Sequence, residues 1–406
     1  MDSLTQAVLG AACGEAVLGK KMGNKALMWG AIAGTIPDLD VVMQFFLSNE
    51  VYELIYHRGL SHSILFTIVG APILGWLAWK HRSWLSMGFW ALLMLFIGGN
   101  TLKGPSAIGI GISVAMLALG GWLTWKLFFK EKPALTQAQL DKEPTHAQWS
   151  WMFFWAILTH WFIDACTSYG TQIFEPFSSY RVSFNNIAII DPLYTLPLLL
   201  SLIILLFIKK TKTRQIINWI GIGLSSAYMI FSFYAKSLAN QAFKESLKAQ
   251  GIEYNEFISY PSIFTTLLWQ TTVKSDSAYY FAAYSLMDKD KNIEFIKLPI
   301  NHHLLDKYED EDYVRVLKWF AQGYYNVTEG EDGLLHFHNL RFGLMGFGVV
   351  EFDNPYIFSF RIGERNGKFD TWIDREEDLK QVDMGQALSV FWRRTWGDKT
   401  KEKPKK

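Results

Sequence analysis

The stretch HRGLSHSILFTIVGAPILGWLAW, residues 57–79, places two histidines and an arginine directly before a long apolar run. The run at 63–79 has the composition of a membrane-spanning helix, although it falls slightly short of the roughly 20 residues that a span needs. Five further runs, at 84–99, 105–125, 149–166, 193–208 and 216–235, are also apolar, and tryptophans gather near segment ends as they do at membrane interfaces. The sequence therefore predicts a mainly α, polytopic helical membrane bundle with about six spans.

The composition predicts that a more polar, solvent-exposed region accompanies the membrane bundle. Half of the 406 residues are hydrophobic and 19% are charged, against about 25% charged residues in soluble domains. The mean hydropathy of +0.10 is modest for a chain with so many apolar runs. A formal net charge of +1 argues against a nucleic-acid partner held by bulk charge. Cys13 and Cys166 lie in separate apolar segments, with no spacing typical of a disulfide framework or a zinc finger.

Two short stretches near the N-terminus, 7–19 and 26–36, are rich in glycine and alanine. Small residues let helices approach closely in a membrane, so we expect a short helical hairpin packed against the bundle or re-entrant in it. The membrane-embedded part is expected to occupy 1–235. Charge density rises after it, and 236–398 predicts a smaller extramembrane α+β domain, with hairpins at 277–299 and 356–373 and an amphipathic helix at 310–320. The end, 399–406, is expected to be a disordered basic tail.

Basic residues alternate between the loops that join the predicted spans. Lys80 and Arg82, the lysines of 126–142, and the basic cluster 209–214 all fall on one side, which the positive-inside rule makes cytoplasmic. The start of the first span, the end of the fourth and the start of the fifth then face outward. The extramembrane domain is expected on that outer, periplasmic side of an inner membrane.

Ionisable residues gather in four segments that this orientation brings to the outward face. They are Asp38, Asp40, His57, Arg58, His62, His160, Asp164 and Asp191. His160 and Asp164 are four residues apart and share one helix face. They lie inside an otherwise apolar span, where ionisable groups are costly and usually mark function.

Each segment also has a structural interpretation when it is taken alone. The aspartates after Pro37 suit a turn, and so does Asp191 before Pro192. Ser61 could cap a helix while Arg58 binds lipid phosphate, and His160 could simply bond to Asp164. The loop charges place all four segments at one face without using these residues, so we favour a shared site.

Mixed imidazole and carboxylate ligands suit zinc, iron or manganese. The candidate ligands outnumber those that one tetrahedral ion takes, so one ion or two are expected, as in two-metal hydrolases. We expect Asp191 to be a ligand or to orient an imidazole, and Arg58 to bind an anionic oxygen of the substrate. A turn at Arg58-Gly59 would let both histidines of the motif point inward. The predicted ligands are Asp38, Asp40, His57, His62, His160 and Asp164.

Several motifs in order resemble the bacterial membrane-bound metal-dependent hydrolase family, the LexA-regulated, YdjM-like group. They are MDSLTQ at 1–6, GAACGE at 10–15, WGAIAGTIPDLD at 29–40, HRGLSHS at 57–63, HWFIDACTSYGTQ at 160–172 and IIDPLYTLP at 189–197. The resemblance covers roughly residues 1–208 and implies an inner-membrane, metal-dependent hydrolase. Many members carry histidine where this chain has Gln6. Glu15 stands where members often have an acid, which makes it a second-tier metal ligand.

We therefore expect a metal-dependent hydrolase that acts at the outer membrane face, on a lipid or lipid-linked phosphoester. The alternative is a non-enzymatic membrane protein whose cluster serves metal- or proton-coupled transport, or braces a partner-binding scaffold. The bilayer and an amphiphilic substrate are the expected partners, and a nucleic acid is not. His336 and His338 would share one face of a strand, but two such residues alone do not make a metal site.

Overall fold

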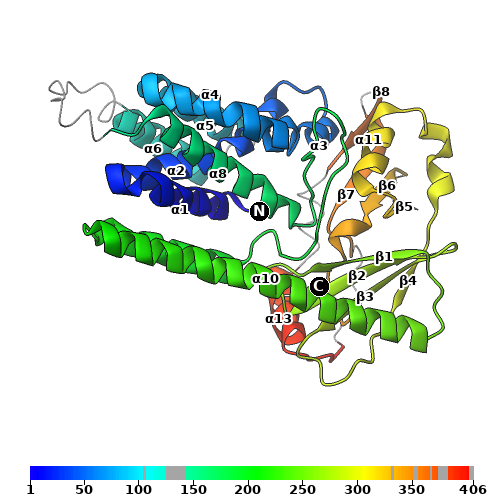
Figure 1. Ribbon diagram of the computed structural model, residues 1–406. Helices are drawn as coiled ribbons and strands as arrows, with labels where there is room; N and C mark the ends of the chain where they lie inside the picture. The colour runs from blue at the N-terminus through cyan, green and yellow to red at the C-terminus, as the bar shows by residue number, and fades with distance from the viewer. Residues whose placement is uncertain are drawn as a thin grey trace.

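A computed structural model describes residues 1–103, 107–124, 143–330, 333–350, 355–365, 368–373 and 383–401. Figure 1 shows a group of helices beside a part that contains the strands. The helical part consists of α1 (Ser3–Met22), α2 (Asn24–Thr35), η1 (Pro37–Phe45), η2 (Glu50–Tyr52), α3 (Glu53–Tyr56), η3 (Leu60–His62), α4 (Ile64–Lys80), α5 (Arg82–Lys103), α6 (Ala107–Thr124), α8 (His146–Ala165), α9 (Pro192–Phe207) and α10 (Thr211–Ala249). The fold is mostly helical, as predicted.

The prediction of six spans is not confirmed. By length and composition, two described helices can cross a membrane, α5 over Arg82–Asn100 and α10. The number rises to four if α2 with η1, bent by 49°, and Glu50–His62 with α4, bent by 59°, each form one broken span. The breaks follow from the sequence, because Pro37 and the HRGLSH turn interrupt the helical hydrogen bonding on the N-terminal side of η1 and α4.

Some predictions fall on positions that the structure does not describe. The predicted span 105–125 includes positions 105–106 and 125, and the lysines of 126–142 lie wholly outside the described residues. The same holds for the Asn-Gly turn at 366–367 and for 402–406 of the predicted tail. The orientation derived from the loop charges therefore stays a prediction.

The predicted N-terminal hairpin is confirmed as α1 and α2, which lie side by side (Figure 1). Their backbones touch at four glycines. A Cβ on Gly10 would lie 2.4 Å from the Gly30 carbonyl oxygen, and one on Gly14 would lie 2.2 Å from that of Ala26. A Cβ on Gly34 would lie 2.5 Å from the carbonyl oxygen of Gln6. Glycine at these positions is what allows the close approach of the two helices.

Helix α10 connects the two parts of the molecule. Its 39 residues span about 58 Å, roughly twice the hydrocarbon core of a bilayer. The predicted domain boundary after residue 235 lies inside this helix, which continues without interruption. Beyond that point Ala239 and Phe243 pack against Trp269 and Tyr284 of the first sheet. One continuous helix therefore links the membrane part to the strands.

The strands form two antiparallel four-stranded sheets, each in sequential order. The two predicted hairpins and the amphipathic helix are present, as β3–β4, β7–β8 and α11. The second sheet packs around Phe337 and Phe360 against Val51 and Leu54 of the helical part. The elements are β1 (Glu256–Pro261), β2 (Leu268–Lys274), β3 (Tyr279–Ser285), β4 (Ile296–Leu298), η5 (His302–Tyr308), α11 (Asp312–Ala321), β5 (Tyr325–Glu329), β6 (Leu335–Asn339), η6 (Leu340–Phe342), β7 (Ser359–Arg365), β8 (Lys368–Trp372) and α13 (Met384–Thr395).

Arg341 in η6 joins the second sheet to the loop that follows α8. Its guanidinium donates to the carbonyl oxygen of Ser168 at 2.9 Å and to Ser183 Oγ at 3.1 Å. A third bond goes to the carbonyl oxygen of Phe320 at 2.7 Å. Hydrogen bonds from a charged donor are among the stronger ones, so this residue holds the strand-containing part against the end of α8.

His338 on β6 gives the strand-containing part a predicted pH dependence. Burial, with a smaller contribution from His336, lowers the pKa of this imidazole to about 3. Thr328 Oγ1 and Ser359 Oγ lie 2.8 and 2.7 Å from its two nitrogens. Between pH 3 and the usual value of 6.5 the unfolded chain binds the extra proton, so stability falls as the pH falls. We expect a loss of about 2 kcal/mol between pH 7 and pH 5.

The measurement is thermal unfolding in detergent at pH 5 and pH 7, followed by near-ultraviolet circular dichroism. His338→Gln should flatten the difference between the two pH values. His303→Gln, which changes an exposed histidine, should preserve it. An unchanged pH slope in His338→Gln would show that another group is responsible.

Candidate metal centre

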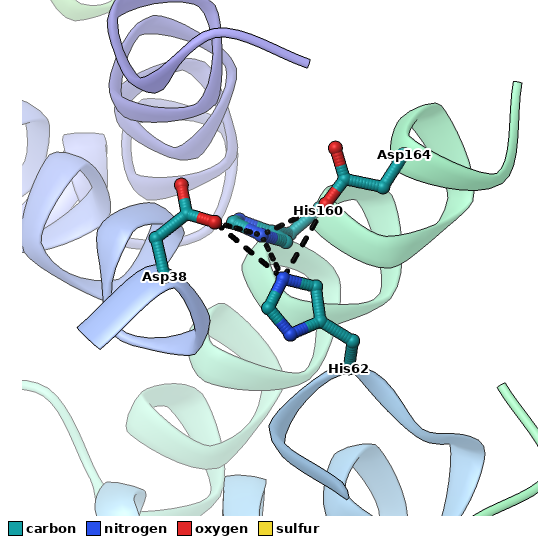
Figure 2. Close-up of side chains that lie close together, drawn as sticks. All are labelled: Asp38, His62, His160 and Asp164. Carbon is teal, nitrogen blue, oxygen red and sulfur yellow. Dashed lines mark hydrogen bonds and ion pairs between the residues drawn. The ribbon is translucent and has the colours of Figure 1, made fainter. Parts of the chain in front are cut away.

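Four of the predicted ligands converge on one point between η1, η3 and α8. They are Asp38, His62, His160 and Asp164, and one ligand atom of each lies within 4.8 Å of the others (Figure 2). Three of the side chains are fully or almost fully buried, and Asp38 is 16% exposed. In the part of the chain that the structure describes, this is the one group with spacing suited to a metal ion.

Local sequence explains how three separate segments reach this point. His160 and Asp164 lie on one face of α8, as their spacing predicts. Pro37 begins η1 and turns the chain after α2, which brings Asp38 to the end of the hairpin. Arg58 adopts a positive φ of 60°, which makes the predicted turn and brings His62 inward from η3.

Five of the six separations between the ligand atoms are close to those around a tetrahedral ion, and the two carboxylate oxygens lie within 4.8 Å of each other. The two imidazole Nε2 atoms, of His62 and His160, are 3.0 Å apart. Asp38 Oδ1 lies 3.5 and 3.3 Å from them, and Asp164 Oδ2 lies 3.4 Å from both. Metal–ligand bonds of roughly 2.0–2.1 Å place tetrahedral ligand atoms about 3.3 Å apart. Two imidazoles and two carboxylates are the donor set expected for zinc, iron or manganese.

Hydrogen bonds on the far side of each imidazole fix its tautomer. His160 Nδ1 donates to the carbonyl oxygen of Gly34 at 2.6 Å. His62 Nδ1 lies 2.9 Å from Ser61 Oγ and 3.3 Å from Asp40 Oδ2, while Ser61 Oγ donates to the same carboxylate oxygen. With Nδ1 as the donor, each neutral imidazole directs its Nε2 lone pair at the centre. Such partners are what orients histidine ligands in metal sites.

This arrangement leaves electron-rich atoms facing one another. The two Nε2 lone pairs meet Asp38 Oδ1 and Asp164 Oδ2, and Asp164 Oδ2 is buried without a hydrogen-bond partner. Buried acceptors without a donor are costly. A divalent cation among the four atoms would satisfy all of them at once, so the residues present fit a metal ion.

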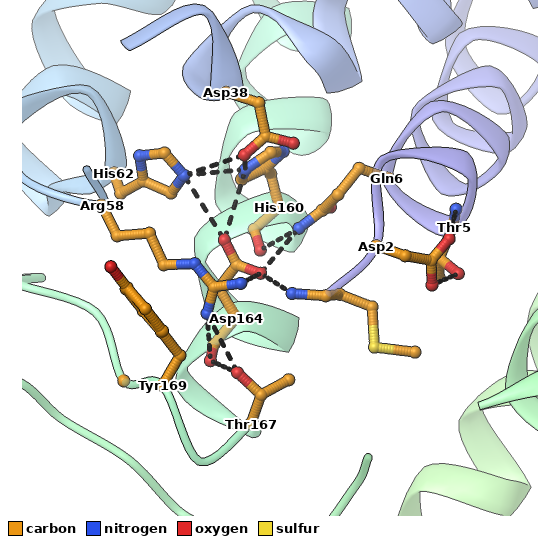
Figure 3. Close-up of polar contacts among 12 residues, drawn as sticks. Asp2, Thr5, Gln6, Asp38, Arg58, His62, His160, Asp164, Thr167 and Tyr169 are labelled. Atoms are coloured by element: carbon orange, nitrogen blue, oxygen red, sulfur yellow. Dashed lines mark hydrogen bonds and ion pairs between the residues drawn. The ribbon is translucent and has the colours of Figure 1, made fainter. Parts of the chain in front are cut away.

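The other oxygen of Asp164, Oδ1, is held by donors from three directions (Figure 3). Gln6 Nε2 donates to it at 3.0 Å, Arg58 Nη2 lies 3.3 Å away, and the Met1 amino group contacts it. Arg58 also donates to Thr167 Oγ1 at 2.9 Å and is 4% exposed. The placement favours a role for Arg58 as the counter-ion of Asp164 over the substrate contact expected from the sequence.

Comparison with protein-family models identifies the family to which the chain belongs. A family model described as YdjM inner membrane protein matches residues 1–101 and 109–239. The chain belongs to the YdjM inner membrane protein family. Neither the curated proteins nor the solved structures that were compared give a match.

The YdjM match agrees with the resemblance found in the sequence motifs, and with the apolar helices it identifies an inner-membrane protein. Every residue of the four-ligand group lies inside the matched ranges. The match ends at 239, within α10, so both sheets lie beyond it.

Asp40 and His57 lie beside the four-ligand group of this YdjM protein and bind one another. His57 Nδ1 is 2.9 Å from Asp40 Oδ1, and the His57 side chain is 27% exposed. Asp40 Oδ2 accepts from the backbone amide of Arg58 and from Ser61, and it faces His62 Nδ1. Asp40 is thus placed to orient His62 rather than to touch the same ion.

Two further predicted residues lie away from the group. Glu15 forms a two-bond ion pair with Arg214 of α10, at 2.9 and 2.6 Å. Asp191 caps α9, accepting from the Leu193 amide at 3.1 Å and from the Tyr228 hydroxyl at 2.9 Å. Both carboxylates are buried, and both serve helix packing in the structure.

Gln6 is the residue of this site that sequence reasoning did not assign. Its side chain donates to Asp164 Oδ1 and, at 3.2 Å, to the carbonyl oxygen of His160. The signal that could have pointed to it was its place in the N-terminal motif MDSLTQ, at residues 1–6. In this chain an amide at that position supports Asp164 from α1.

Gly34→Ala tests how α2 supports the centre. The added methyl group would lie 2.5 Å from the Gln6 carbonyl oxygen and 2.9 Å from Gly10 Cα, so α1 and α2 must separate. We expect a loss of about 1–3 kcal/mol in stability and weaker metal retention, because the Gly34 carbonyl moves away from His160 Nδ1. Melting temperature and metal content are measured together. Gly88→Ala on α5, with open space at its Cβ, is the control and should preserve both. Unchanged values in Gly34→Ala would contradict this account of the α1–α2 contact.

Proposed function

We propose that this YdjM-family protein is an integral inner-membrane metal-dependent hydrolase. Its metal ligands are Asp38, His62, His160 and Asp164, and zinc fits the tetrahedral spacing best, with iron or manganese as alternatives. The proposal rests on the geometry of His62 and His160. Their Nε2 atoms lie 3.0 Å apart, and the Nδ1 atom of each ring bonds to a partner on the side away from the centre.

Each ligand has a neighbour that fixes its orientation. Asp40 and Ser61 hold His62, and the Gly34 carbonyl holds His160. Gln6 and Arg58 occupy Asp164 Oδ1 and leave Oδ2 directed at the centre. When bound, a divalent cation would supply Lewis-acid activation of water for hydrolysis. Asp38, the most exposed of the four side chains, marks the side from which water or substrate approaches.

One ion accounts for the geometry better than two. A second ion would draw its ligands from Asp40 and His57, but these side chains bind each other at 2.9 Å. Asp40 also faces the Nδ1 of His62, which holds a proton when Nε2 binds the ion. The proposal therefore has a single ion, with Asp40 as the residue that orients one imidazole.

A second candidate function, a non-enzymatic structural metal site, is favoured by the number of ligands. Four protein ligands fill a tetrahedral zinc site, whereas catalytic zinc sites keep a position open. Such an ion would cross-link η1, η3 and α8 and so stabilise the helical part of the protein. In that case the ion would stabilise the protein without supporting turnover.

Hydrolysis assays distinguish the two candidates. The purified protein in detergent is offered amphiphiles that carry an ester, an amide or a phosphoester bond, and turnover is compared between wild type and His62→Ala. We expect His62→Ala to abolish any turnover, whereas Asp191→Asn, which changes a buried carboxylate outside the group, preserves it. Bound metal together with equal background rates in all three proteins would favour the structural role.

We also propose that the strand-containing part lies on the periplasmic side, as the loop charges predict. Lys289 is exposed on this part of the chain, whereas Cys13 and Cys166 are buried. Lys289→Cys should react with a membrane-impermeant maleimide in cells whose inner membrane is intact. Labelling only after the inner membrane is broken would reverse the orientation.

A further inference from the structure

A cavity of about 330 Å³ lies directly beside the four-ligand group. Asp40 and His57 form part of its wall, and the same Asp40 carboxylate faces His62 Nδ1. One residue therefore separates the space inside the cavity from a proposed metal ligand. A molecule in this cavity would lie close to the centre.

The position of the cavity suits an amphiphile that comes from the bilayer. One wall is formed by Phe96 and Asn100, near the end of α5, a helix long and apolar enough to cross a membrane. Phe358, Phe360 and Ile373 of the strand-containing part also line it. The cavity thus lies where a candidate span ends and the extramembrane part begins, which is the depth of lipid headgroups.

The charge of the lining favours a cation. Asp40, Glu50 and Glu53 contribute carboxylates, and no lysine or arginine is among the described residues that line the space. Arg58 and Arg181, which lie over the ring of the lining residue Tyr169, are committed to other partners. Arg58 pairs with Asp164, and Arg181 donates to backbone carbonyl oxygens, including that of Leu54 at 2.8 Å. A phosphate or sulfate group would meet like charge here, and an ammonium group would meet opposite charge.

Aromatic rings complete the environment expected for a cation. Tyr56, Phe358 and Phe360 line the same space as the carboxylates, whereas the Tyr169 ring already holds Arg58 and Arg181 at 4.9 and 4.7 Å from its centroid. Aromatic faces attract ammonium groups, and the attraction is larger where water is excluded. The apolar wall near Phe96 would meanwhile accommodate the start of an acyl chain.

We infer that this cavity binds the positively charged headgroup of an amphiphile, with its acyl chain directed along α5 toward the bilayer. The inference rests on the proposed function, because it names the substrate class of that site. It changes one expectation from the sequence. The substrate is an amphiphile with an amine-bearing headgroup, whereas the sequence suggested one recognised through an anionic phosphate.

The test measures binding and needs no turnover. Dodecylamine and dodecyl phosphate are titrated into the protein in a non-ionic maltoside detergent, and heats of binding are recorded for each. We expect dodecylamine to bind at least about tenfold more tightly, since one cation in a carboxylate and aromatic site is worth roughly that factor. Dodecyl phosphate binding as tightly as the amine would overturn the inference.

Variants locate the binding. Glu50→Gln combined with Glu53→Gln should reduce amine affinity about tenfold or more, and Tyr56→Ala, which changes an exposed cavity residue, should also weaken it. Glu143→Gln, a partly exposed acid in another part of the bundle, is the matched control and should change nothing. Unaltered amine binding in both cavity variants would overturn the inference.

The same titration in EDTA separates this inference from the proposed function. Amine binding that persists in metal-free protein supports the cavity by itself, whatever the outcome of the hydrolysis assays. Metal and turnover without a preference for the amine would leave the hydrolase in place and remove the headgroup site.

Discussion

Replacing Asp164 with asparagine is expected to lower the metal content of the purified protein from about one ion per chain to less than roughly a tenth. Asp164 Oδ2 lies 3.4 Å from both histidine Nε2 atoms and is buried without another partner. The substitution removes a charged ligand and leaves Arg58 buried without its counter-ion. Metal content is measured by elemental mass spectrometry on protein that elutes as one species in size-exclusion chromatography.

Asp191→Asn is the matched control for this experiment. Asp191 is as fully buried as Asp164, but it caps α9 and bonds to Tyr228. Asparagine is also a good helix cap, so the variant should fold and keep its metal. Equal loss of metal in both variants would indicate a general effect of removing a buried carboxylate, and full retention in Asp164→Asn would exclude this residue as a ligand.

Glu15→Gln is expected to destabilise the helical bundle by about 3–5 kcal/mol, because it leaves a buried arginine without its anion. Arg214 is 4% exposed and makes two bonds to Glu15, with others to Asn24 and to the Leu205 carbonyl oxygen. The pair joins α1 to α10. Loss of it should appear as a large fall in melting temperature in detergent.

Two comparisons separate the buried charge from other effects of the substitution. Glu143→Gln breaks an ion pair with Arg82 whose side chains are 39% and 29% exposed, and it should cost no more than about 1 kcal/mol. Replacing Glu15 and Arg214 together with methionine should recover most of the loss, since paired apolar residues often substitute well for a buried ion pair. A double variant as unstable as Glu15→Gln would show that the pair does more than neutralise Arg214.

Periodicity and topology predicted the parts of the site that local chemistry determines. The i, i+4 spacing of His160 and Asp164 places both on one helix face wherever α8 packs. Ionisable groups in an apolar helix cost free energy, and their presence there was itself the signal of function. Asp38 and His62 were predicted because loop charges brought their segments to the same face, and the structure joins them to α8.

Residues whose roles depend on partners far away in the sequence could not be assigned in this way. Glu15 was a candidate ligand, but its partner is Arg214, 199 residues later. Arg58 resembled a substrate-binding residue, because no local pattern shows that it reaches Asp164 across 106 residues. Asp40 and His57 have ligand chemistry, and only the tertiary packing shows that they bind each other.

The prediction of six spans stays unconfirmed, because apolar composition does not show where a helix breaks. Residues 24–45 and 50–80 form bent pairs, and α9 has 16 residues, so within the described residues the apolar runs outnumber the helices long enough to cross a membrane. The same breaks position the ligands, since η1 and η3 lie at the two bends. The irregular segments that lower the span count are therefore the ones that build the centre.

The central claim is tested most directly by the metal content of wild-type protein purified without added metal, combined with X-ray absorption at the edge of the metal found. We expect close to one zinc, iron or manganese ion per chain, with only nitrogen and oxygen neighbours at roughly 2.0–2.1 Å, two of them imidazoles. Protein that holds no stoichiometric transition metal, and takes up none from zinc, iron or manganese salts, would contradict the account.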